Sequence, residues 1–142
     1  MIDSAVMKRV RIRLALVAAA SVALLGGCGG DDGGETETAR GAAEAYVKAR
    51  NQGDAGKLCQ LYTDELIQRL GASDCEAFIK EQTAGVATSY TLVGVRENGD
   101  HATATIRAQA AGEVGNAAPK LRIELTREGD EWRVSAVPGG GD

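Results

Sequence analysis

The sequence contains few of the residues that most often carry catalysis or bind metals. Its 142 residues include one histidine, three cysteines, one tryptophan and one phenylalanine. The histidine, His101, cannot complete a four-ligand zinc shell with two cysteines unless acids join them, and it lies on a polar strand face after an Asn-Gly turn. No G-x-S-x-G motif marks a serine nucleophile. We therefore predict no catalytic residue, no metal site and no cofactor, and we interpret His101 as a solvated turn residue.

Basic residues are scarce after position 27. The first 27 residues hold four basic residues and one acid, so the rest of the chain has 12 Lys and Arg against 19 Asp and Glu, a formal charge of −7. That remainder shows no cluster of Lys or Arg in the sequence, which phosphate binding would need. The sequence therefore predicts no nucleic-acid partner.

No apolar run is long enough to cross a bilayer. The longest, Leu14 to Leu25, has 12 residues and is interrupted only by Ser21, whereas a spanning helix needs about 20. It follows a basic cluster, and that order is typical of a secretory signal. Either Met1 or Met7 is the expected start, because initiation at Met7 gives a more ordinary basic segment.

Cys28 follows this run directly and raises four possibilities: a disulfide partner, a metal ligand, a reactive thiol or a modified residue. The segment Leu25-Gly26-Gly27-Cys28 resembles the lipobox of bacterial lipoproteins. The resemblance implies cleavage before Cys28, diacylglycerol on its sulfur and anchoring on the extracytoplasmic face of the cell membrane, where acyl chains hold a domain without a spanning helix. The alternative is an ordinary secreted protein in which Cys28 stays free.

The remaining chain is expected to form one domain. After a lipoprotein signal over residues 1–27, the Gly-rich and acidic residues 28–38 lack aliphatic side chains and are interpreted as a flexible tether. Residues 39–138 have the length of a single compact domain, and residues 139–142 form a short tail.

Apolar spacing predicts three helices in the first half of this domain. Thr38 to Asn51 places apolar residues and Arg50 on one face at a spacing of 3.6 residues, and Gly53 suits the end of this helix. Asp54 can cap a second helix, and Thr63 one or two further turns. Ser73 to Glu76 has the pattern of a capping box that starts the third helix.

The second half alternates apolar and polar residues, which predicts four antiparallel strands. The expected strands cover residues 90–97, 102–110, 121–126 and 132–136. Asn98-Gly99 suits a type I′ turn between the first two. Helices followed by strands indicate an α+β fold, in which three N-terminal helices pack on one face of a curved sheet.

Cys59 and Cys75 remain once Cys28 is lipidated. Because disulfides persist in exported proteins, we predict a bond between them, which would link the second and third helices. The alternative is two buried, unpaired thiols.

The order of these elements resembles the nuclear transport factor 2 superfamily, also called cystatin-like. The residues that carry the resemblance are the opening helix with its tyrosine (AAEAYVKARNQGD) and the closing hairpin (EGDEWRVSAV). More narrowly, the chain resembles small lipid-anchored members that are common in actinobacteria. The resemblance implies a cone-shaped fold whose members include isomerases, dehydratases, ligand-binding domains and dimerising domains.

Three functions follow as hypotheses. The inward strand positions are apolar and offer no proton-transfer group, so we favour a non-catalytic, lipid-anchored domain that binds a protein partner or forms a homodimer through its open sheet face. The first alternative is a carrier of a small apolar molecule or lipid, and the second is an isomerase- or dehydratase-like enzyme. The expected pocket residues are Tyr46, Tyr62, Ala104, Ile106, Ile123 and Trp132.

Overall fold

The structure is a computed structural model that describes residues 34–113 and 118–139. Four helices precede four strands along the chain. The helices are α1 (Ala39–Gln52), α2 (Ala55–Leu61), α3 (Asp64–Arg69) and α4 (Cys75–Thr83). The strands are β1 (Thr88–Asn98), β2 (His101–Ala110), β3 (Lys120–Glu128) and β4 (Glu131–Ala136). The predicted signal, Cys28 and most of the predicted tether and tail lie outside the described residues.

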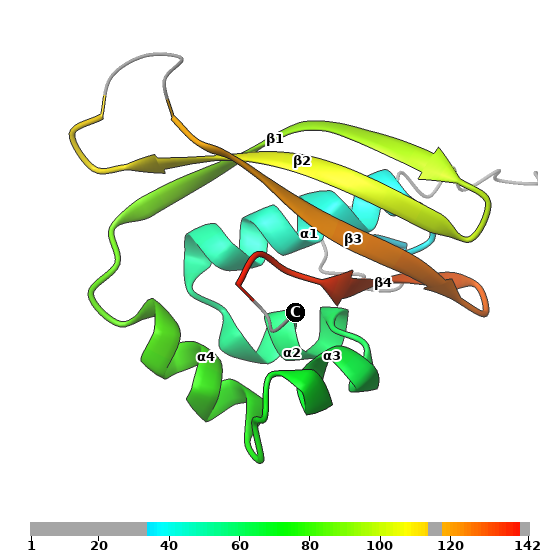
Figure 1. Ribbon diagram of the computed structural model, residues 1–142, viewed down its shortest axis with the longest axis horizontal. Helices are drawn as coiled ribbons and strands as arrows, with labels where there is room; N and C mark the ends of the chain where they lie inside the picture. Colours follow the sequence, from blue (N-terminus) through cyan, green and yellow to red (C-terminus); the bar gives the residue numbers. More distant parts are fainter. Residues whose placement is uncertain (1–33, 114–117, 140–142) are drawn as a thin grey trace, which may run out of the picture.

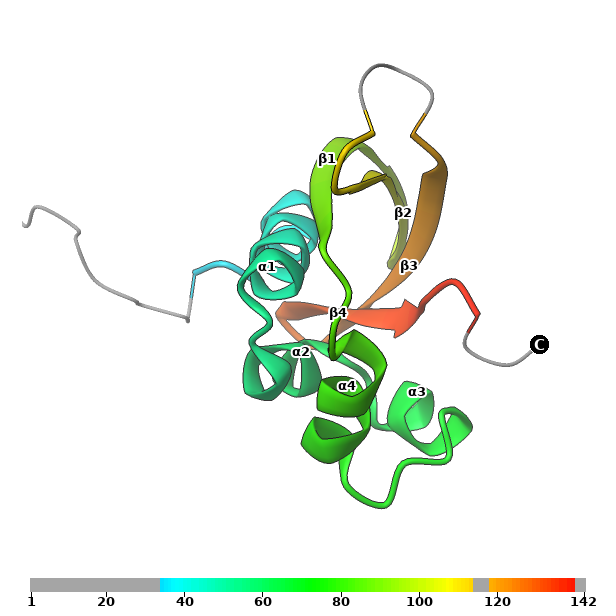
Figure 2. The same ribbon diagram turned by 90° about the vertical axis from the view of Figure 1, so that its left-hand side faces the viewer.

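The strands form one antiparallel sheet in the order β1-β2-β3-β4. The sheet is curved and open, with α1 lying across one of its faces and α2, α3 and α4 grouped below β4 (Figure 1). Seen from the side, α1 lies on one side of β1–β3, and no helix of the described residues covers the other side of these strands (Figure 2). The predicted α+β class and the curved sheet of four strands are therefore confirmed.

The structure has four helices where the sequence predicts three. Residues near Thr63, which were expected to add a turn, form the separate helix α3. The break arises because Tyr62 is extended and forms a β-bridge with Val134 of β4, and the Thr63 N–H donates to the Val134 carbonyl at 2.9 Å. These bonds hold the chain against the edge of the sheet before Thr63 caps the next helix.

The other helix ends follow the expected capping chemistry, with one exception. Thr38 and Asp54 cap α1 and α2 through their side-chain oxygens, and Gly53 ends α1 at a φ of 66°. The predicted serine cap of α4 is wrong, because Asp74 is the cap and its carboxylate accepts from the Ala77 N–H at 3.0 Å. A carboxylate beside the positive end of a helix is also favoured electrostatically.

The two outer hairpins use the same Gly-Asp loop. Asn98 pairs with His101, so the first loop consists of Gly99 and Asp100 and not of Asn98 and Gly99. Among the described residues only glycines have positive φ, and Gly99 is at 64°. A positive φ at the first loop position alone is typical of a type II′ turn, so the predicted type I′ turn is wrong. Gly129 repeats this geometry between β3 and β4.

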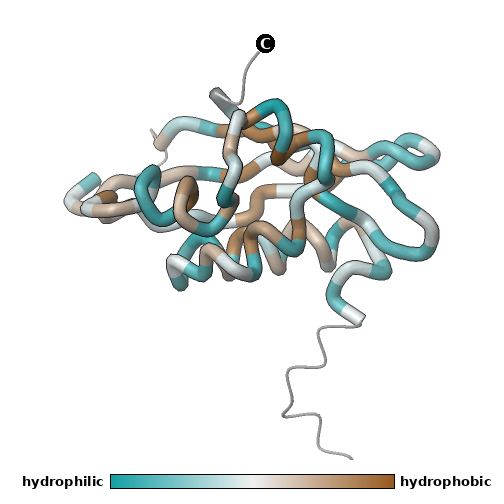
Figure 3. Tube along the Cα trace, turned by 90° about the horizontal axis from the view of Figure 1, so that it is seen from below, coloured by the Kyte–Doolittle hydropathy of each residue, from teal (hydrophilic) through white to brown (hydrophobic). Residues whose placement is uncertain are grey.

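The core lies between α1, α2 and the inner face of the sheet. The inward strand positions are buried as the alternation predicts, and α1 contributes mainly alanines, which let the helix approach the sheet closely. Hydrophilic positions gather at loops and turns, and hydrophobic ones in the packed elements (Figure 3). The fully buried large side chains are Leu58, Leu61, Leu66, Ile106, Ile123, Leu125 and Val134.

The predicted disulfide is confirmed. Cys59 of α2 and Cys75 of α4 are bonded, with their Cα atoms 6.0 Å apart and a sequence separation of 16. The bond joins α4 to the helix that packs on the core. Over the described residues, none of the helices is long and apolar enough to span a membrane.

Candidate functional site

A small pocket lies between α1, the inner face of the sheet and the segment that follows β4. Its volume is about 110 Å³. One wall is apolar and the other carries the phenol groups of three tyrosines together with an arginine. The lining residues are Tyr46, Arg50, Tyr62, Tyr90, Ile106, Leu121, Ile123, Val137 and Pro138.

Arg50 is the only charged residue among the described residues that line this pocket. It extends from the last turn of α1 to β1, where its Nη2 donates to the Tyr90 hydroxyl at 2.6 Å and its guanidinium carbon lies 4.7 Å from the ring centre. Its Nε is buried and has no hydrogen-bond partner. Since none of the described lining residues is a carboxylate, the groups described around the positive charge are the ring face and the tyrosine hydroxyls.

The neighbouring Asn51 fixes the distance between α1 and β1. Its Oδ1 accepts from the Tyr90 N–H at 2.7 Å, and its Nδ2 donates to the Tyr90 carbonyl at 2.9 Å. The side-chain amide thus forms the same two hydrogen bonds to the Tyr90 backbone that a neighbouring strand would form. This pairing holds Tyr90 in place and therefore positions the hydroxyl that Arg50 contacts.

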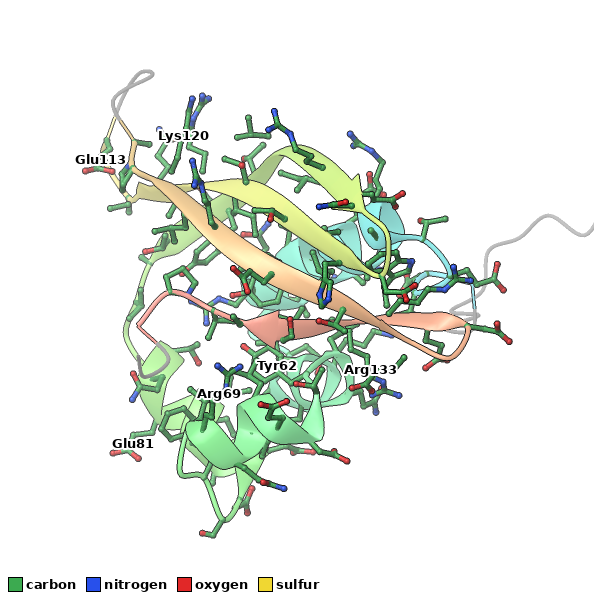
Figure 4. The ribbon with its side chains drawn as sticks, turned by 45° about the vertical axis from the view of Figure 1, so that its right-hand side comes forward. Tyr62, Arg69, Glu81, Glu113, Lys120 and Arg133 are labelled. Atoms are coloured by element: carbon green, nitrogen blue, oxygen red, sulfur yellow. A yellow bond between two sulfur atoms is a disulfide. The ribbon has the colours of Figure 1, made fainter. Side chains whose placement is uncertain are left out.

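Tyr46 and Tyr62 both line the pocket, with ring centres 6.4 Å apart. In Figure 4, Tyr62 lies between β4 and the helices. Burial is the largest cause that raises the pKa of both tyrosines, and it outweighs the opposite effect of the Arg50 charge. Both phenols are therefore neutral near pH 7, and they can donate hydrogen bonds but cannot act as bases.

Four of the six expected pocket residues line this pocket: Tyr46, Tyr62, Ile106 and Ile123. Ala104 and Trp132 do not line it, because they pack within the core at 0% and 4% exposure. Sequence reasoning missed Arg50 as a site residue and left Tyr90 out of the expected pocket residues. The signal for Arg50 was its position on the inward face of the first helix, where a charged residue needs a specific environment.

The pocket lining offers no acid-base pair. Within residues 34–113 and 118–139, it contains neither a carboxylate nor a histidine. His101 is exposed on the outer face of the sheet, after the first hairpin loop. Over the described residues, no group of three or more His, Cys, Asp or Glu could hold a metal ion. The arrangement suits binding of a small molecule better than proton transfer.

A second feature lies on the outer face of the sheet. The strand register places Arg96 opposite Thr103, Arg122 opposite Thr105 and Lys120 opposite Arg107. We call these four basic residues the cationic face: Arg96, Arg107, Lys120 and Arg122. These residues belong to three different strands, so they form no cluster of basic residues in the sequence.

Comparisons with known proteins inform the fold alone. No protein-family model and no curated protein matches the sequence. The solution structure of a SEC-C motif-containing protein from Rhodopseudomonas palustris is similar with a TM-score of 0.54 and 13% identity, over 70% of this chain and 77% of that one. A de novo designed protein with a curved β-sheet has a TM-score of 0.47 at 16% identity, over 68% of this chain and 93% of that one. The first likeness supports a helix-covered, curved sheet.

Proposed function

We propose that this protein is a lipid-anchored, non-catalytic extracytoplasmic domain that binds a small carboxylate in the pocket around Arg50. The observation that carries the proposal is the guanidinium of Arg50, whose buried Nε has no hydrogen-bond partner and whose described neighbours in the pocket lining are all uncharged. Arginine is well suited to hold a carboxylate because its N–H groups match the two carboxylate oxygens. The tyrosine hydroxyls add further donors.

The size of the pocket limits the ligand. A volume of about 110 Å³ is below the range of about 300–1,000 Å³ that drug-sized ligands occupy. The pocket therefore suits a short carboxylic acid whose apolar end contacts Ile106 and Leu121. This chemistry modifies the carrier hypothesis, in which the ligand was expected to be apolar throughout.

The resemblance to the nuclear transport factor 2 superfamily belongs to this proposal. In such a cone, the first helix and the curved sheet enclose a cavity, and α1 with β2 and β3 encloses the pocket here. The absence of a carboxylate from the lining favours a binding function over the isomerase or dehydratase alternative. Dimerisation through an apolar sheet face has less support, since the outer face is polar.

The lipid anchor remains a proposal that rests on the lipobox-like segment before Cys28. Its test is the Cys28→Ala variant expressed in a bacterial host that lipidates such segments. The variant should move from the membrane fraction to the soluble secreted fraction, and its mass should lack the acyl groups. Retention of the variant in the membrane would contradict the anchor without affecting the pocket.

Ligand binding can be tested on residues 28–142 carrying Cys28→Ser, which include every described element. Butyrate and its neutral amide, butyramide, are titrated while the tyrosine resonances are followed by NMR. Loss of a charge-assisted pair costs about 1.5–3 kcal/mol, so butyramide should bind at least about tenfold more weakly than butyrate. Equal affinities would contradict a carboxylate site, and so would the absence of saturable shifts.

Matched variants on α1 identify the group responsible. Arg50→Gln should weaken butyrate binding about tenfold, whereas Arg40→Gln removes the same charge from an exposed position of the same helix and should leave binding unchanged. Thermal unfolding of both variants separates loss of binding from loss of fold. Butyrate binding by folded Arg50→Gln at the wild-type affinity would overturn the proposal.

A further inference from the structure

The cationic face consists of residues that repel one another. Lys120 and Arg107 lie directly opposite on adjacent strands, and Arg122 is two residues from Lys120 on the same side of β3. Like charges that face each other across strands destabilise a sheet. Figure 4 shows Lys120 at the end of β3, among side chains that extend away from the helices.

Among the described residues, no carboxylate forms a close ion pair with these four cations, although Glu124 lies on the same face two residues from Arg122. Arg96, Arg107, Lys120 and Arg122 take part in none of the ion pairs formed within residues 34–113 and 118–139. Arg133, at the other end of the same face, contacts Glu131 at 3.1 Å and Glu128 at 3.4 Å. The Nε of Arg107 is buried without a hydrogen-bond partner. A chain with an excess of acids thus leaves these particular cations unpaired.

The cationic face also contains an apolar element. Three of its cations border a surface hollow of about 570 Å³, and Val93 and Val95 of β1 line the same hollow. Val93 is 47% exposed and is one of only two large hydrophobic residues exposed in the described part of the chain. It protrudes at the irregularity between Leu92 and Gly94. An occupant that uses the whole hollow needs apolar groups as well as negative charge.

The position of the cationic face relative to the start of the described chain indicates what kind of partner it contacts. The described chain begins beside α1, whereas the uncovered side of β2 and β3 faces away from α1 (Figure 2). If the chain is anchored upstream at Cys28, as proposed above, α1 is nearer the membrane attachment than the cationic face is. This orientation favours a partner protein over the lipid surface to which the domain is attached.

We propose that the cationic face binds an acidic, partly apolar polypeptide segment of a partner protein. Side chains on one side of an extended segment repeat about every 6.8 Å, as do Lys120 and Arg122 along β3. Carboxylates with this spacing would pair with Arg107, Lys120 and Arg122, and an apolar side chain on the same side of the segment would contact Val93. Binding of the segment would relieve the repulsion between the opposed cations.

The test uses residues 28–142 with Cys28→Ser and a fluorescein-labelled peptide of about ten residues, in which every second position, on one side of the extended chain, is Glu except for two that are Val. Fluorescence anisotropy should show saturable binding that weakens about tenfold between about 0.05 M and 0.5 M NaCl. A peptide with Ser in place of Val should bind about fivefold more weakly, and so should the Val93→Ser variant with the original peptide. Absence of saturable binding would overturn the proposal.

Charge-matched variants distinguish this face from general electrostatic attraction. Lys120→Glu with Arg122→Glu should weaken binding of the peptide about tenfold or more. Arg40→Glu with Lys80→Glu changes the net charge equally on α1 and α4 and should alter the affinity less than about twofold. Equal losses in the two double variants would overturn the proposal. A second result would also overturn it: tight binding of inorganic polyphosphate, together with unchanged peptide binding by Val93→Ser. That result would indicate that the partner of this face is a phosphate polymer and not a polypeptide.

Discussion

The two faces of the sheet are built from alternate residues of the same strands, yet their chemistry is opposite. On the inner face of β2 the side chains are Ala102, Ala104 and Ile106, all at most 4% exposed. On the outer face they are Thr103, Thr105 and Arg107, which no helix covers. The comparison shows that packing determines one face, whereas the other is free to carry unpaired charge.

Two arginines illustrate this difference. Arg50 and Arg107 each have a buried Nε without a hydrogen-bond partner. Arg50 lines an interior pocket with three phenols, whereas Arg107 lies across from Lys120 on the outer face. The first arrangement favours one small anion held by several donors. The second favours an extended partner that contacts several cations.

The largest expected difference between the faces concerns stability. Ile123 and Arg122 are adjacent on β3 but point to opposite sides, and Ile123 is 1% exposed. Ile123→Ala should lower the free energy of unfolding by about 3–4 kcal/mol, because it removes buried methyl groups and leaves a cavity. Arg122→Ala should change it by less than about 0.5 kcal/mol. Urea unfolding of both variants measures the contrast, and similar losses would contradict the assignment of the two faces.

The next prediction concerns α4, which belongs to neither face and has Ile79 as its only buried residue. Because so little of this helix is buried, the Cys59–Cys75 bond should supply much of its attachment. Replacing both cysteines by alanine should cost about 3 kcal/mol in the chain-entropy account of a loop of this length. Hydrogen exchange should show faster opening of α4 than of the sheet. Unchanged protection of α4 would show that packing alone holds it.

The sequence predicts the inner face better than the outer one. Alternation identifies Ala102, Ala104, Ile106 and their β3 partners as buried, because burial against a helix layer requires apolar side chains at every second position. The unexpected fourth helix depends on a bridge between Tyr62 and Val134, which are far apart in the chain. Local propensity carries no information about such a contact.

The functional features also depend on contacts between distant residues. Tyr90 joins the pocket because Asn51 pairs with its backbone across 39 residues. The cationic face depends on register, since only strand pairing brings Arg107 beside Lys120. Residue types and periodicity thus predict which side of a strand is buried. They do not predict which residues are neighbours on adjacent strands, because that depends on the register of strand pairing.

A third prediction concerns pH and the interior phenols. Burial raises the pKa of Tyr46 and Tyr62 in the folded protein above the unfolded value, which is about 10. The free energy of unfolding is therefore unaffected by these phenols below pH ~10. Between its unfolded and folded pKa, each phenol lowers the free energy of unfolding by about 1.4 kcal/mol per pH unit, because the unfolded state loses its proton first. Tyr62→Phe should flatten this decline in urea unfolding above pH ~10. An identical decline in the variant would contradict burial as the cause.

The smallest expected effect is that of a charge reversal on the outer face, which should change the free energy of unfolding and the affinity for the peptide in opposite directions. Lys120→Glu replaces a like-charged pair with an opposite pair across from Arg107, so it should raise the free energy of unfolding by about 0.5 kcal/mol. The same change should weaken binding of the acidic peptide, because it removes one of the cations that bind it. Glu124→Gln is the control, since Glu124 is also exposed on β3 but lies opposite Thr103, and it should not stabilise the fold. If Lys120→Glu destabilises the protein, the opposed cations do not repel one another as the register implies, and no relief of repulsion would then favour an acidic partner.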